Sequence, residues 1–159
     1  MPTLPETVDL IDGVIVTLDS SLPGALTNPS TEQELSERRG SSAEQVEAAL
    51  AAAARVHGDG TWHRSGAHAR ADAIRRFADR LAQYVPQMAD ADALNSGVLH
   101  GITTAMADGA ADRLRAVADR LVEVGQESTE IGRGNGPVVR NRAPWGPAVI
   151  IGPWNAPLA

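Results

Sequence analysis

One short run of residues near the end of the chain constrains the fold more than any other feature. Residues 148–151 are Ala-Val-Ile-Ile, an uninterrupted apolar stretch with a Gly-Pro pair on either side. A short apolar run bounded by glycine and proline is typical of a strand buried on both faces, as in a parallel sheet. Such a strand needs neighbouring strands, and the preceding sequence offers few candidates. We therefore expect an α/β fold that is incomplete as given, with the sheet built by sequence beyond residue 159.

Helical patterns fill the middle of the chain. The predicted helices cover about residues 42–57, 67–84, 86–95 and 102–124. Ser42, followed three residues later by Gln45, predicts a capping box at the start of the first helix. In the second helix we expect Ile74, Phe77 and Leu81 to face inward. The fourth helix carries an apolar stripe at helical spacing, formed by Met106, Ala110, Leu114, Val117, Leu121 and Val124.

Turn-forming residues separate the expected strands and loops. Asp12 and Gly13 lie between two β-rich runs and predict a hairpin, because both residue types tolerate positive φ. Residues 20–30, rich in proline and glycine, predict a loop, and residues 34–38 a short polar strand. Residues 126–136 also predict a loop, and residues 138–142 an exposed strand.

Composition excludes several classes of function. The chain carries 20 acids and 14 bases, for a net charge of −6, and no basic cluster, so we expect no binding to nucleic acid or to an anionic membrane. It has no cysteine, which removes thiol nucleophiles and disulfides from these residues. No signal-peptide pattern opens the chain, and no apolar run approaches the ~20 residues that span a bilayer. We expect a cytoplasmic protein.

Two other patterns do not predict sites. The four histidines, His57, His63, His68 and His100, form no i,i+4 pair, so we expect no metal site. The glycine-rich residues 132–136 neither follow a predicted strand nor open a helix, as a phosphate-binding loop would. We interpret them as a flexible loop.

The residues that follow the apolar run are the best candidates for chemistry, because α/β proteins place ligands at the carboxyl ends of parallel strands. The Asn155 amide is suited to donate a hydrogen bond to a developing oxyanion, and Trp154 to cover a flat ligand. Asn155 also fits as the N-cap of a following helix, with Pro157 in its first turn. The residues alone favour the cap, because capping is the commoner use of asparagine at such a position.

Residues 140–158 resemble the aldehyde dehydrogenase family, whose pattern is Arg-x-x-Pro-x-Gly, an apolar strand, then Pro-Trp-Asn-x-Pro-Leu. Upstream, residues 28–31 are similar to the family's Asn-Pro-Ala-Thr-Gly segment. Residues 42–56 and 70–81 are similar to its first two helices. The resemblance covers nearly the whole chain in the expected order.

The resemblance implies the amino-terminal part of an aldehyde-dehydrogenase-like α/β fold. Residues 1–133 would be the mostly helical start of the coenzyme-binding domain, and residues 134–147 a strand and turn of the oligomerisation arm. Residues 148–159 would begin the Rossmann-like sheet. The implied activity is oxidation of an aldehyde to a carboxylate with NAD or NADP, in a homo-oligomer.

Roles for individual residues also follow from the resemblance alone. Asn155 matches the family's oxyanion-hole asparagine. Ile151, Gly152, Pro153 and Trp154 match the stretch that lines the nicotinamide-cofactor cleft.

The chain departs from the family pattern in two places. Residues 95–99 (Asn-Ser-Gly-Val-Leu) stand where the family carries Asp-x-Gly-Lys-Pro, and lack both the lysine and the proline. The family's ribose site, cofactor loop, catalytic glutamate and nucleophilic cysteine are absent from these 159 residues. We expect the chain alone to be inactive. The alternative is a non-catalytic remnant, or an interaction module that pairs with a full-length relative through residues 138–147.

Overall fold

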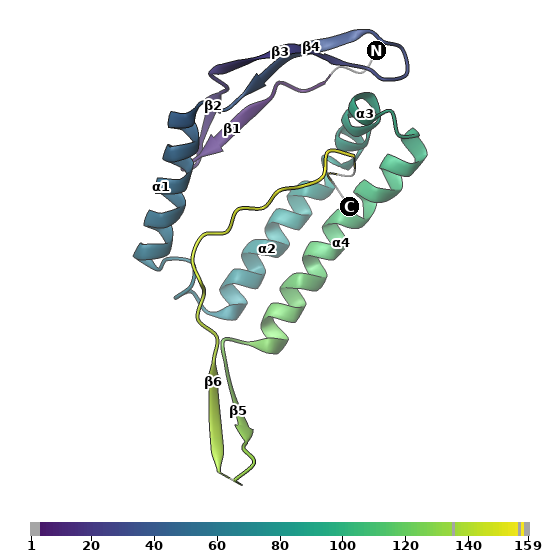
Figure 1. Ribbon diagram of the computed structural model, residues 1–159. Coiled ribbons are helices and arrows are strands. Elements are labelled where there is room, and N and C mark those ends of the chain that lie inside the picture. The colour runs from purple at the N-terminus through teal and green to yellow at the C-terminus, as the bar shows by residue number, and fades with distance from the viewer. Residues whose placement is uncertain (1–3, 135, 156, 158–159) are drawn as a thin grey trace.

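Figure 1 shows a computed structural model of the chain, which describes residues 4–134, 136–155 and 157. Among these residues are four helices and three separate two-stranded antiparallel sheets. The elements in order are β1 (Val8–Ile11), β2 (Val14–Thr17), β3 (Ser20–Thr27), β4 (Glu34–Gly40), α1 (Ala43–Asp59), α2 (Ala67–Ala82), α3 (Val85–Ser96), α4 (His100–Val124), β5 (Glu127–Ile131) and β6 (Pro137–Asn141).

Helices α2 and α4 lie side by side, and α3 packs against α4 near one end of the pair (Figure 1). The buried side chains between them are small. At most 3% of the surface is exposed on Ala71, Ala78, Ala89, Ala107, Ala111 and Ala118. Alanine lets two helix backbones approach closely, so this core consists of closely spaced backbones rather than of large side chains.

The expected inward residues of α2 and α4 are partly wrong. Val117 is 56% exposed, whereas its neighbour Ala118 is fully buried. Phe77 is 60% exposed, and the buried positions of α2 are Ala71 and Ala78. The apolar pattern did not distinguish the alanine face, which meets the other helix, from the bulkier face beside it.

Two arginines lie across the outside of the α2–α4 pair. Arg75 of α2 donates to Asp119 of α4 at 2.7 Å, and Arg115 of α4 donates to Asp79 of α2 at 2.7 Å. These hydrogen bonds raise the pKa of Arg75 and of Arg115. Both pairs are exposed, so they set the alignment of the helices more than their stability.

The first hairpin is confirmed. Strand β1 pairs with β2, and Leu10 lies opposite Ile15. Asp12 and Gly13 adopt φ values of 51° and 81° at the turn, the left-handed region that the sequence predicted.

The loop expected over residues 20–30 is wrong for most of its length, because Ser20–Thr27 forms β3 and pairs with β4. A register shift between Ser21 and Ala25 accommodates Pro23 in the strand. Proline is tolerated at such an irregularity, because no ladder hydrogen bond is required of it there. The polar strand expected over residues 34–38 is confirmed as the start of β4.

The capping box of α1 is confirmed. The Ser42 hydroxyl accepts a hydrogen bond from the Gln45 backbone N–H at 3.2 Å, and Gln45 Oε1 accepts one from the Ser42 N–H at 2.8 Å. Gln45 also contacts the strands: its Nε2 donates to the Thr17 carbonyl at 2.6 Å, and its Oε1 accepts from Asp19 N–H at 3.2 Å. One buried side chain therefore caps the helix and joins it to the first hairpin.

The loop expected over residues 126–136 is wrong for residues 127–131, which form β5. With β6 they make a hairpin that projects away from the helices (Figure 1). At its tip the Gly132 N–H donates to the Gly136 carbonyl at 2.8 Å. The hairpin begins before residue 134, and the division of the chain into three parts stays a prediction.

Residues 148–151 form no strand, so the buried parallel strand expected here is not present. The side chains of Val149, Ile150 and Ile151 are exposed. A parallel strand forms only against neighbouring strands, and none of the three described hairpins pairs with residues 148–151. In the part of the chain that is described, no helix has the length and apolar character to cross a membrane.

Candidate functional site

The candidate site lies on the extended segment that follows β6. This segment, yellow in Figure 1, returns from the hairpin past α1 and α2 towards α3. Pro144, Gly146 and Pro147 line one side of a cavity of about 660 Å³ against α1. Pro157 lines a second cavity, of about 390 Å³, with residues of α3. Residues 148–155 lie between these two cavities along the chain.

The predicted site residues lie together on this segment but are open to solvent. Ile151 is 91% exposed and Trp154 is 74% exposed. Asn155 is exposed and lies in a turn that includes Trp154. Ala156 and Leu158, which complete the motif, lie outside the described residues. The five predicted residues are consecutive in the chain, and among the described residues no other element covers them.

Both interpretations of Asn155 stay open. Asn155 and Pro157 are turn residues, and no helix starts within the described residues that follow Trp154. The oxyanion role needs a reacting carbonyl near the amide, and the cap role needs a helix after it.

Open, mainly apolar surface surrounds the candidate cofactor-binding residues. Gly152 has open space around it, since an added Cβ would meet nothing within 4 Å. Ile151 and Trp154 offer apolar surface on either side of it. A flat ring suits such a surface, which has no ionisable side chain between residues 151 and 155. The residues present therefore fit the nicotinamide end of a cofactor.

Sequence reasoning missed Asp92. Asp92 of α3 is buried, with 7% of its surface exposed. Neither of its carboxylate oxygens has a hydrogen-bond partner among the described residues. Asp90 contacts the His100 ring, with 2.8 Å between Oδ1 and Nε2. The available signal was spacing: Asp92 lies three residues after buried Ala89, on the inner face of α3.

Comparison with known proteins assigns the fold. A model of the aldehyde dehydrogenase family matches residues 18–159. The chain belongs to this family. Among family members, 3,6-anhydro-alpha-L-galactose dehydrogenase of Vibrio sp. (strain EJY3) is 26% identical over 149 residues, which is 94% of this chain and 31% of the relative.

Solved structures of aldehyde dehydrogenases match the arrangement of the elements. Betaine aldehyde dehydrogenase from Staphylococcus aureus in complex with NAD+ has a TM-score of 0.69 at 21% identity. The match covers 82% of this chain and 25% of that one. An apo variant of the same enzyme gives the same TM-score. The predicted α/β fold, the amino-terminal part of an aldehyde dehydrogenase, is confirmed, and the chain spans about a third or less of these relatives' lengths.

Proposed function

We propose that this chain contributes the amino-terminal part of an enzyme that oxidises an aldehyde to a carboxylate with NAD+ or NADP+. The observation that carries the proposal is the family match over residues 18–159, which includes the turn containing Asn155. The NAD+ complex of the Staphylococcus aureus relative supports the class of cofactor. The nucleophile must come from outside these residues, because the chain has no cysteine.

In this proposal Asn155 stabilises negative charge on the substrate. Its amide donates a hydrogen bond to the carbonyl oxygen as that oxygen becomes an oxyanion, and the donor stays neutral throughout. Ile151, Gly152, Pro153 and Trp154 hold the flat end of the cofactor beside this point. When bound, the cofactor accepts the hydride that leaves the substrate carbon.

Replacing Asn155 tests the proposal. In the complete enzyme we expect Asn155→Ala to lower kcat by about 10²–10³, the usual loss for one oxyanion donor. We expect kcat/KM to fall by a similar factor, because the hydrogen bond strengthens only in the transition state. Steady-state kinetics with saturating cofactor measure both values.

A matched substitution separates chemistry from folding. Gln87→Ala removes an exposed side-chain amide from α3 and should leave kcat unchanged. If Asn155 only caps a helix, Asn155→Ala should cost about 1 kcal/mol of stability and leave kcat intact. That second result would remove the oxyanion role.

A second function is favoured by the β5–β6 hairpin. It projects from the helices, all of β6 is exposed, and its outer edge is free to pair with another strand (Figure 1). The chain would then act as an interaction module that adds its hairpin to a full-length relative. In a complete enzyme the same edge would join subunits of a homo-oligomer.

The intact mass of the native protein distinguishes the two functions. An antibody to residues 1–159 should detect a species of about three times 16.6 kDa if the chain is part of a complete enzyme, since it covers 31% of its relative. A native species of 16.6 kDa would favour the interaction module. Cytoplasmic location stays a prediction from the sequence.

A further inference from the structure

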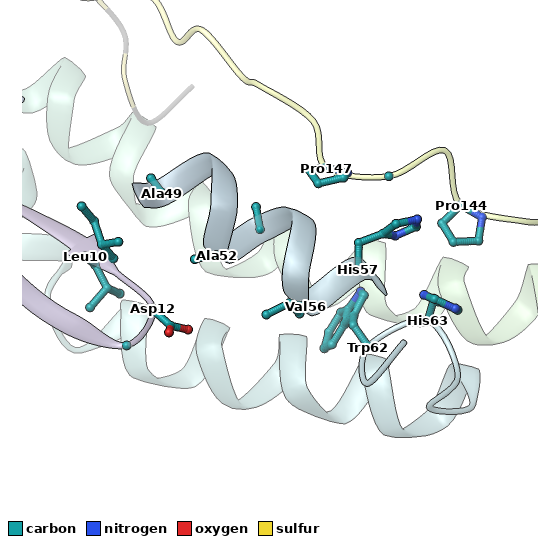
Figure 2. Close-up of a pocket in the computed structure, with 14 residues that line it drawn as sticks. Leu10, Asp12, Ala49, Ala52, Val56, His57, Trp62, His63, Pro144 and Pro147 are labelled. Carbon is teal, nitrogen blue, oxygen red and sulfur yellow. The ribbon is translucent and has the colours of Figure 1, made fainter. Parts of the chain in front are cut away.

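Tertiary structure brings together two histidines that the sequence keeps apart. His57 lies in the last turn of α1, and His63 in the loop that leads to α2. Their ring centres are 5.2 Å apart, at one end of the cavity lined by Pro144 and Pro147 (Figure 2).

The loop that carries His63 is held in place. Gly60 ends α1 with a φ of 67°, which turns the chain back, and the Arg64 N–H donates to the Gly60 carbonyl at 2.9 Å. Arg70 of α2 donates to the His63 carbonyl at 2.9 Å. Hydrogen bonds therefore hold the loop backbone at and beside His63.

This separation is compatible with a metal ion shared by the two rings. A zinc–nitrogen bond of about 2.1 Å places the centre of an imidazole ring about 3.2 Å from the metal. Two such rings at the tetrahedral angle have centres about 5.2 Å apart. Rotation about each metal–nitrogen bond leaves the angle between the ring planes free, so the observed 46° is compatible.

The ring nitrogens are available to a ligand. Within the described ranges, neither His57 nor His63 makes a side-chain hydrogen bond, and both residues are half-buried. Gly146 faces the His57 ring, and even an added Cβ there would remain 3.9 Å from Nε2.

The nearby arginines bond to oxygen atoms rather than to the histidines. Arg55 pairs with Asp12 of the first hairpin and with Asp59 of α1. Arg64 donates to the Asp59 carbonyl. Each nearby cation is thus engaged with an oxygen, and none makes a hydrogen bond to either imidazole.

We propose that His57 and His63 bind one divalent transition-metal ion of the zinc class. Among the described residues no group of three or more His, Cys, Asp or Glu side chains surrounds a common point, so the remaining positions are open to water. Imidazole ligands select zinc, nickel or copper over magnesium and calcium, which prefer oxygen. The ion connects the end of α1 to the loop before α2, beside the segment that leads to Asn155. The site is independent of aldehyde oxidation.

Calorimetric titration of the 159-residue chain tests the site. We expect one Zn²⁺ per chain and no binding of Mg²⁺. His57→Gln and His63→Gln should each weaken zinc binding by more than about tenfold, since loss of even an outer partner of a ligand costs about 10–100-fold. His68→Gln is the matched control: it removes an exposed histidine from the first turn of α2 and should leave the affinity unchanged.

Two further measurements complete the test. Circular dichroism should show both glutamine variants folded, and zinc should raise the unfolding temperature of the unsubstituted chain but not of either variant. Binding should also weaken on acidification, because protons compete for the imidazole nitrogens. Equal binding by His57→Gln and the unsubstituted chain would overturn the proposal, as would an equal loss in His68→Gln.

Discussion

At the residue scale, Gln45 connects more of the molecule than any neighbour in α1. It is buried, it completes the capping box, and it hydrogen-bonds to Thr17 and Asp19 beyond the helix. Removing the side chain leaves the Thr17 carbonyl and the Asp19 N–H without this partner, which costs more than the loss of a cap alone. Ser42 contributes the cap without the tertiary contacts.

We therefore predict that Gln45→Ala lowers the free energy of unfolding by more than Ser42→Ala does. The cap alone is worth about 1 kcal/mol, and each of the lost hydrogen bonds to Thr17 and Asp19 adds about 0.5–1.5 kcal/mol. Urea titrations measure the difference. Gln87→Ala, at an exposed position of α3, is the matched control and should change stability by less than about 0.5 kcal/mol. Equal losses for Gln45→Ala and Gln87→Ala would contradict the argument.

At the scale of elements, the α2–α4 pair depends on small side chains. Ala78 and Ala118 are both fully buried, with no measurable exposed surface. A larger side chain at either position must separate the helices or adopt a strained rotamer. The four-carbon side chain of leucine is a direct test of that closeness.

We predict that Ala118→Leu destabilises the chain by about 1–3 kcal/mol, although leucine is a good helix former. Ala116→Leu, two residues earlier on the exposed face of α4, should change the free energy of unfolding by no more than about 0.5 kcal/mol. Chemical denaturation measures the free energy of unfolding of both variants. A stabilised Ala118→Leu would mean that the helices are less closely packed than described.

At the scale of the whole molecule, the described chain leaves apolar surface uncovered. Val149, Ile150 and Ile151 are all more than three-quarters exposed and lie in succession. Isolated exposed apolar residues are normal, but a contiguous apolar run with free backbone groups promotes association. We therefore expect contacts that cover this run to keep the chain from associating through it.

We predict that the 159-residue chain self-associates in solution, and that Ile150→Glu reduces this association. A charge in the middle of the run opposes both strand pairing and apolar contact. Sedimentation velocity at two protein concentrations measures the change. Val117→Glu puts the same charge on an exposed position of α4 and should leave association unaffected. If Ile150→Glu associates as strongly as the unsubstituted chain, residues 149–151 do not form the self-association contact.

Local chemistry by itself determined the helices, their ends and the first hairpin. The Ser42 and Gln45 spacing, the Asp12-Gly13 turn and the Gly60 and Gly97 helix ends depend on interactions within a few residues. The family resemblance likewise depended on a contiguous motif around Asn155. Features of this kind are readable because the partners are neighbours in sequence.

Tertiary structure decided everything that depends on distant partners. Pattern alone did not show that β3 would pair with β4, or β5 with β6. Nor did it show that Ala118 rather than Val117 would be buried, or that Asp92 would be buried. It also did not show that His57 would meet His63. Residues 148–151 carry the local pattern of a buried strand, yet they form none, because a parallel strand gains its hydrogen bonds only from neighbouring strands.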